Sequence, residues 1–255
     1  MKKLMFAAAV AAGFVAFGDG IESANTVGYQ TFTCQPNTWY LLGAQFESTS
    51  GSSLTIQQFI QGAYVAANDT ATAPEIQMWN GNSYDHYFFL SAAYDDDLNE
   101  YENVWANGVG DYTTLAINPG DGVWFKQKGS SAIEITIAGQ VLETSTETFA
   151  LPANQWKCLS NPYPEALALN GNKANWASIL TAASDTATAP EIQMWNGSSY
   201  DHYFFLSAAY DDDLNEYENV WANGVGDYTT YAIPAGEGFW IKNKVGSSVN
   251  LVISK

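Results

Sequence analysis

The chain has 255 residues and a formal net charge of −18 at pH 7, with 9 lysines and no arginine against 27 acidic residues. A surface this negative repels phosphate backbones and anionic lipid headgroups, so we expect no nucleic-acid partner and no membrane insertion. The 9 tryptophans, 15 tyrosines and 13 phenylalanines, with frequent Thr, Ser, Gly and Asn, favour strands and turns.

Residues 1–18 have the layout of a secretory signal peptide. Two lysines precede an apolar run from Leu4 to Phe17, which is shorter than the ~20 residues that a membrane-spanning helix needs. The small residues Ala16 and Gly18 predict cleavage after Gly18. We therefore expect a secreted protein, either free outside the cell or held at its surface.

An internal repeat with an offset of 116 residues organises the rest of the chain. Residues 69–114 match residues 185–230 with a single difference, Asn82 against Ser198. Weaker similarity continues into residues 116–126 and, with one extra residue of offset, back to residue 37. The repeat predicts two tandem homologous modules, residues 19–140 and 141–255.

Strand patterns dominate both predicted modules. The expected elements, in chain order, are strands at 38–44 and 155–160, a helix at 53–67 and another at 173–183, hairpins at 75–90 and 112–128, a helical turn near Trp105, and a half-buried strand at 133–137. The first hairpin has an Asn-Gly turn at residues 80–81. The fold class is therefore all-β, with two tandem β-sandwich or small-barrel modules, each with at most one or two short helices.

The two cysteines test this picture. Strand alternation directs Cys34 and Cys158 into the interiors of different modules. Separately folded modules keep two such thiols too far apart to bond. We expect two free, buried cysteines that behave as small hydrophobic residues.

Short motifs carry a resemblance to known proteins. They are the start of the predicted mature chain (residues 21–30, IESANTVGYQ), the paired strands Gly-Asp-Gly-Val-Trp and Gly-Glu-Gly-Phe-Trp at residues 120–124 and 236–240, and Leu-Ser-Asn-Pro-Tyr-Pro at residues 159–164. With these motifs the chain resembles secreted tandem β-domain proteins of Verrucomicrobia-like and Lentisphaera-like bacteria. The resemblance implies export and a β fold, and no catalytic residues carry over from it.

An acidic loop that occurs in both repeats is a candidate calcium site. Carboxylates crowded into eight residues repel one another, and Ca²⁺ with its oxygen ligands relieves that repulsion. The 1-3-5 spacing of an EF-hand loop selects Asp95, Asp97 and Asn99, and, in the second repeat, Asp211, Asp213 and Asn215. The rest of the EF-hand pattern is missing, because Glu100 occupies the glycine position and Ala106 the bidentate glutamate position. A solvated loop without metal is the competing interpretation.

Aromatic residues around the acidic loop are candidate ligand or interface residues. They are Trp79, Tyr84, Tyr94 and Trp105, with Trp195, Tyr200, Tyr210 and Trp221 in the second repeat. Such rings stack on sugars, fill cores, or form self-association surfaces. Both faces of the strand at residues 84–90 carry aromatic side chains, which favours packing or an interface over an open sugar site.

Catalysis is not expected. His86 and His202 are the two histidines, and no second histidine or cysteine is spaced to share a metal with either. No nucleophile motif supports a Ser-His-Asp arrangement. A pair of catalytic carboxylates would have to fit twice into modules of about 115 residues, which is unusual.

Two functions remain open from the sequence. The favoured one is a secreted structural protein that assembles with itself into extracellular filaments or a surface layer, since a repeated unit with a non-closing contact builds open assemblies. The alternative is a bivalent carbohydrate-binding module or adhesin, calcium-dependent or not, in which two equal sites increase avidity for an extracellular polysaccharide.

Overall fold

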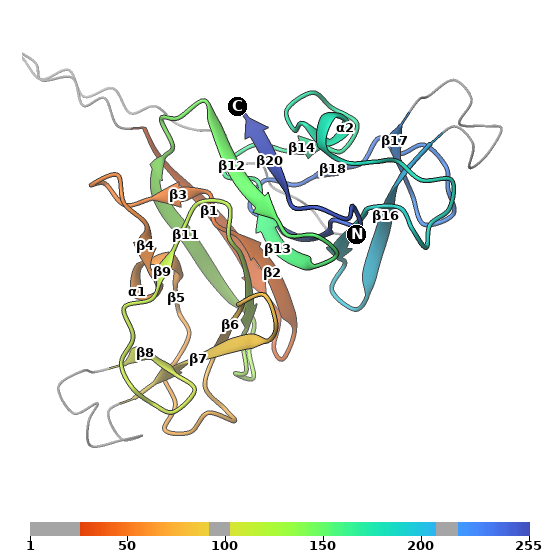
Figure 1. Cartoon of the computed structure of the whole chain (residues 1–255). Helices are drawn as coiled ribbons and strands as arrows, with labels where there is room; N and C mark the ends of the chain where they lie inside the picture. The colour runs from red at the N-terminus through yellow and green to blue at the C-terminus, as the bar shows by residue number, and fades with distance from the viewer. Residues whose placement is uncertain (1–25, 92–102, 208–218) are drawn as a thin grey trace, which may run out of the picture.

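The computed structural model describes residues 26–91, 103–207 and 219–255, and it is built almost entirely from antiparallel strands (Figure 1). Among these residues the helices are two single turns, α1 (Ile56–Phe59) and α2 (Trp176–Ile179). The all-β fold class expected from the sequence is confirmed. The signal peptide, the six candidate calcium ligands, Tyr94 and Tyr210 lie outside the described residues.

Residues 26–141 form three sheets. The largest has five strands in the order β2-β10-β6-β7-β8, the second has the order β1-β11-β3 with β5 also on β11, and the third pairs β4 with β9. The strands are β1 (Val27–Cys34), β2 (Trp39–Gly43), β3 (Phe46–Glu47), β4 (Leu54–Thr55), β5 (Gln61–Gly62), β6 (Glu75–Trp79), β7 (Tyr84–Leu90), β8 (Val104–Asn107), β9 (Ala116–Ile117), β10 (Gly122–Lys126) and β11 (Ile133–Val141).

Residues 146–255 form an equivalent set. Their five-stranded sheet has the order β13-β19-β15-β16-β17, and two-stranded sheets pair β12 with β20 and β14 with β18. The strands are β12 (Thr146–Leu151), β13 (Trp156–Ser160), β14 (Leu167–Ala168), β15 (Glu191–Trp195), β16 (Tyr200–Leu206), β17 (Val220–Ala222), β18 (Ala232–Ile233), β19 (Gly238–Lys242) and β20 (Val249–Ser254). The register is also equivalent, with Gln77 opposite His86 and Gln193 opposite His202.

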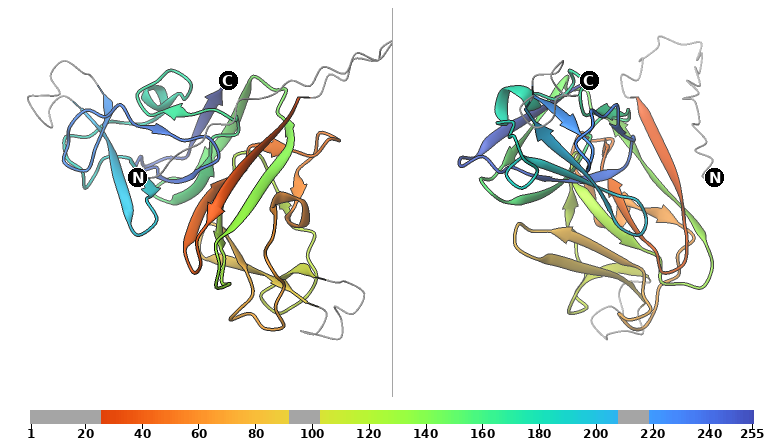
Figure 2. Two further views of the ribbon diagram at one scale, coloured as in Figure 1. Left: turned by 180° about the vertical axis from the view of Figure 1, so that it is seen from behind. Right: turned by 90° about the vertical axis from the view of Figure 1, so that its right-hand side faces the viewer.

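No named sheet of the described residues combines strands from both ranges. Two isolated bridges cross between them, Leu42 to Glu237 and Asp121 to Leu159. The two five-stranded sheets point toward different ends of the molecule, as both turned views in Figure 2 show. We call residues 26–141 the first half and residues 146–255 the second half. The division of the whole chain into modules 19–140 and 141–255 stays a prediction, and its join falls just before Val141, the last residue of β11.

Each half has its own hydrophobic core beneath its five-stranded sheet. Each core contains a tryptophan with no exposed surface, Trp105 in the first half and Trp221 in the second. Both cysteines are free and buried, as expected, and they belong to different clusters. Cys34 lies in the first core, as expected. The expectation for Cys158 was wrong, because it lies outside the second core and packs where the two halves meet.

The structure corrects three further sequence-based expectations. Residues 112–128 do not form a hairpin, because β9 pairs with β4 while β10 pairs with β2 and β6. The backbone of the intervening turn bonds elsewhere, with Gly120 N donating to Ala44 O at 2.8 Å. The expected helices at 53–67 and 173–183 shorten to one turn each, and α1 ends where β5 joins β11. Trp105 lies on strand β8 and not on a helical turn.

Candidate functional site: paired aromatic faces and two repeated surface features

Each five-stranded sheet buries one face in its own core and carries aromatic residues on the other face. This follows from the alternation of side chains along a strand. The first aromatic face is made of Trp39, Leu41, Trp79, Tyr84 and Trp124, and the second aromatic face is made of Trp156, Cys158, Trp195, Tyr200 and Trp240. All ten residues belong to one packed cluster, so the two faces cover each other.

The hydrogen bonds across this interface are reciprocal. The indole N–H of Trp79 donates to the backbone oxygen of Trp156 at 3.2 Å, and the indole N–H of Trp195 donates to the backbone oxygen of Trp39 at 2.9 Å. The two bonds join equivalent residues in opposite directions. That is the signature of an approximate twofold axis between the halves.

The ring contacts obey the same symmetry. Trp79 meets Trp240 edge to face with centroids 5.4 Å apart, and Trp195 meets Trp124 at the same distance. Edge-to-face pairs at this separation are the favoured aromatic geometry. Burial in the interface raises the pKa of Tyr84 to about 12. These rings are therefore desolvated by the opposite half.

Backbone also crosses the interface symmetrically. Gly43 N donates to Gly236 O at 2.7 Å, and Ser160 N donates to Gly120 O at 2.8 Å. The end of β2 is thus bonded to the turn before β19, and the end of β13 to the turn before β10.

Two glycines make the close approach possible. A Cβ on Gly122 would lie 2.5 Å from Cys158 Sγ, and a Cβ on Gly238 would lie 2.9 Å from Leu41 Cγ. Any other residue would therefore force the halves apart at the centre of the interface. The positions Leu41 and Cys158 are equivalent in the repeat, so each half presents a side chain to the other half's glycine.

Beyond the interface, each sheet carries a buried carboxylate cluster on the same face. The first glutamate cluster is made of Glu75, Gln77, His86 and Lys128. Glu75 has a side chain only 8% exposed, and it accepts from His86 Nδ1 at 2.8 Å, from Lys128 Nζ at 2.8 Å and from Gln77 Nε2 at 2.6 Å. The charge is thus paired and hydrogen-bonded, which is the condition for burying it.

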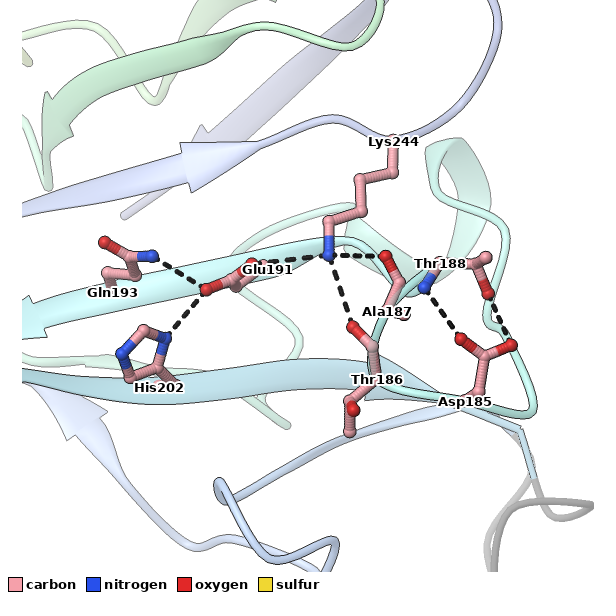
Figure 3. A network of polar contacts seen from close by, with 8 residues as sticks. All are labelled: Asp185, Thr186, Ala187, Thr188, Glu191, Gln193, His202 and Lys244. Atoms are coloured by element: carbon pink, nitrogen blue, oxygen red, sulfur yellow. Dashed lines mark hydrogen bonds and ion pairs between the residues drawn. The ribbon is translucent and has the colours of Figure 1, made fainter.

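The second glutamate cluster reproduces this arrangement (Figure 3). Glu191 accepts from His202 Nδ1 at 2.8 Å and from Gln193 Nε2 at 2.7 Å, and its other oxygen lies 3.3 Å from Lys244 Nζ. The Lys244 ammonium also donates to the backbone oxygens of residues 186 and 187, so it ties the 185–188 turn to the sheet.

The hydrogen bonds outweigh burial in setting the charge of both glutamates. Burial alone would raise the pKa of Glu75, but hydrogen bonds from Lys128, Gln77 and His86 hold it below the ordinary value. The pKa of Glu191 is lowered in the same way, against the same desolvation. Both carboxylates are therefore ionised at neutral pH and act as fixed anchors for the lysines.

A loop with internal hydrogen bonds and an exposed valine follows β8 and β17. In the first valine loop, residues 107–111, Asn107 Oδ1 accepts from Val109 N at 3.1 Å and from Asp111 N at 2.9 Å. The second valine loop, residues 223–227, has the same two bonds at 3.0 and 2.9 Å. Val109 and Val225 are each 74% exposed. An apolar side chain is thus presented twice on a preorganised backbone.

The structure separates the predicted aromatic site residues into two groups. Trp79, Tyr84, Trp195 and Tyr200 pack in the aromatic interface. Trp105 and Trp221 have no exposed surface and belong to the cores, so a ligand on the outside of the chain does not reach them. None of these six rings offers an open stacking platform for a sugar. Tyr94 and Tyr210 lie outside the described residues.

Sequence reasoning missed the glutamate clusters and the role of Trp39 and Trp124. The hairpin register that places Gln77 opposite His86 was readable, but the lysine 53 residues after Glu75 had no local signal. The candidate calcium ligands Asp95, Asp97, Asn99, Asp211, Asp213 and Asn215 are not among the described residues. Within the described ranges, no group of three or more His, Cys, Asp or Glu side chains is placed to hold a metal ion.

Comparisons with known proteins give no family for this chain. No protein-family model matches the sequence, and no curated protein matches it significantly. Within the described ranges, no helix has the length and apolar character to span a bilayer.

Proposed function

We propose that the chain is a secreted, non-enzymatic structural protein that assembles with itself into extracellular filaments or a surface layer. The observation that carries this proposal is the twofold display of the valine loops, each with its valine 74% exposed. A preorganised loop with an apolar side chain favours association, because little conformational entropy is lost when the loop is covered.

The direction of the two loops supports an open assembly. β8 and β17, which lead into the valine loops, lie at opposite ends of the molecule (Figure 1). A neighbour on one loop therefore leaves the other loop accessible. Contacts of this kind continue from chain to chain and need not close into a ring.

The net charge of −18 opposes assembly and gives it a salt dependence. Repulsion between like-charged chains is screened over about 8 Å at physiological ionic strength. We therefore expect assembly to increase from low to physiological salt.

The test uses the chain from residue 19 to residue 255, examined by light scattering and electron microscopy over a range of concentrations, with Ca²⁺ or with a chelator. The variant Val109→Ser with Val225→Ser should assemble less. The matched control is Val65→Ser, because Val65 is 77% exposed but has no counterpart in the repeat. A wild-type chain that stays monomeric at every concentration, with and without Ca²⁺, would overturn the proposal.

A further inference from the structure

We propose that the aromatic faces also join separate chains, with the first aromatic face of one copy packed on the second aromatic face of the next. This inference rests on the proposed self-assembly and names the surface and the partner, a second copy of this chain. The two halves would separate within a chain and re-form the same interface between chains, which is an exchange of halves.

The symmetry of the interface is the first argument. The hydrogen bonds of Trp79 and Trp195, and the edge-to-face pairs of these rings with Trp240 and Trp124, are equivalent in the two directions. An interface between two copies of the chain can therefore contain the contacts that the closed chain contains. The exchanged form loses no ring contact and no hydrogen bond of the two faces.

The connection between the halves is the second argument. The strands β11 and β12 are separated by residues 142–145, of which 143–145 are exposed. The first half holds Val141, whose N–H donates to Thr26 O at 2.8 Å. The second half holds Leu142, which is buried in its core. A change of backbone direction within this short connection is enough to open the chain, because the anchors on both sides can stay in place.

The surroundings of the connection favour opening. A hollow of about 280 Å³ lies between residues 142–144 and the loop at residues 47–51, so the connection is not packed on that side. Glu47 of the first half and Glu143 of the connection line this hollow. Glu147 of the second half lies near enough for its charge to act on Glu47. Partial burial and the charges of the other two raise the pKa of Glu47. Their repulsion acts against the closed arrangement and is relieved when the halves move apart.

Protein concentration decides between the two forms. A short linker gives the attached half an effective concentration of about 1 mM or more, so the closed monomer is favoured in dilute solution. Exchange becomes competitive as the concentration of chains approaches that value.

A disulfide across the interface tests the exchange. A Cβ at residue 122 would lie 2.5 Å from the native Sγ of Cys158, so a small shift of the halves brings the two thiols of Gly122→Cys, in a Cys34→Ala background, within bonding reach. The same clash weakens the closed form of the reduced variant, so Cys34→Ala with Gly122 intact is followed beside it as the reference. The protein is oxidised as a dilute monomer, concentrated, and followed by light scattering. We expect the locked monomer, which keeps only the valine-loop contacts, to assemble much less than the reduced variant at the same concentration, and a reductant to restore assembly.

A second arm reads the same bond in the assembled state. The reduced variant is first assembled, then oxidised and separated on a denaturing gel without reductant. Exchange predicts a ladder of covalently linked chains. Chains that migrate as monomers, or a locked monomer that assembles like the reduced protein, would overturn the exchange and leave self-assembly standing. Absence of assembly in both the reduced variant and the wild type would overturn the proposed function itself.

A second disulfide at the symmetry-equivalent position shows whether a folding defect of the first variant explains the result. Leu41→Cys with Gly238→Cys, in a background without Cys34 and Cys158, repeats the lock on the other side of the axis, where the Cβ of Gly238 would lie 2.9 Å from Leu41 Cγ. Both locks must give the same result for exchange to hold. A ladder from one pair and monomers from the other would count against it.

Discussion

Replacing Gly122 with alanine should open the interface between the halves while leaving each core folded. The added methyl group would lie 2.5 Å from Cys158 Sγ and 2.9 Å from the backbone oxygen of Leu159. The second contact is with backbone, so a side-chain rotation cannot relieve it. Overpacking of this kind costs about 1–3 kcal/mol.

The native cysteines report separately on the interface and on the first core. Cys158 belongs to the aromatic cluster and Cys34 to the core of the first half. Burial raises the pKa of both thiols, that of Cys34 to about 12, so both react slowly with a thiol reagent until they are exposed. Since 1.4 kcal/mol corresponds to a factor of ten, Gly122→Ala should speed labelling of Cys158 roughly fivefold to a hundredfold.

The rate at Cys34 should change much less. The control is Gly246→Ala, where nothing lies within 4 Å of an added Cβ, and it should alter neither rate. Labelling is followed by mass spectrometry of peptides at protein concentrations far below those that permit assembly. Equal acceleration at both cysteines would refute the reasoning, because it would mean that the interface opens only when the first core unfolds.

Other perturbations test the remaining contacts. Glu75→Gln should lower the free energy of unfolding by about 3 kcal/mol at pH 7, because it leaves the Lys128 ammonium without its carboxylate; denaturant titration measures this, and a loss below about 1 kcal/mol would contradict it. Because the pKa of Glu75 is lowered on folding, its stabilisation is present above the unfolded value of about 4.3 and is lost as the pH falls through the lower folded value. The difference between wild type and Glu75→Gln should therefore shrink in acid, and a difference that grows would be inconsistent. Glu47 has the opposite sign: its pKa is raised on folding, so its charge destabilises the closed chain above the folded value, and Glu47→Gln should raise the denaturation midpoint at pH 7 but not at pH 3. Trp79→Phe removes the hydrogen bond to Trp156 O and should cost about 1 kcal/mol, whereas a neutral effect would show that this bond is not a net contributor.

Local signals predicted the elements that local contacts form. The hairpin of β6 and β7 was predicted with its residue bounds, since Asn80 Oδ1 accepts from the backbone N–H of residues 82 and 83 and Gly81 adopts a positive φ of 101°. The alternation at residues 133–137 likewise marked β11, although the strand continues to Val141. The sequence also showed that both faces of β7 carry aromatic residues. In the structure Tyr87 and Phe89 pack on the first core, and Tyr84 on the opposite face packs against the second half.

Long-range contacts were not readable in the same way. β9 and β10 looked like a hairpin because a Pro-Gly turn joins them, but the turn backbone bonds to Ala44, which follows β2, and to Ser160 of the second half. Trp105 was a candidate ligand or interface residue because it lies near the acidic loop, yet it is buried in the first core. When the residues that bury an aromatic side chain come from distant strands, the neighbouring residues in the sequence do not indicate its burial. The hydrogen bond from Trp79 to the backbone of residue 156 could therefore not be predicted from the sequence.

The twofold arrangement also bears on how the protein is made. Domains generally fold as units, with the amino-terminal one first during synthesis. If the first half forms its core before the second half has emerged, the tryptophans of its aromatic face are exposed to solvent until the second aromatic face covers them. If the halves exchange as proposed, the first aromatic face of one chain can pack on a neighbouring chain during that interval, and the delay between the halves, set by the pace of translation, influences which partner arrives first.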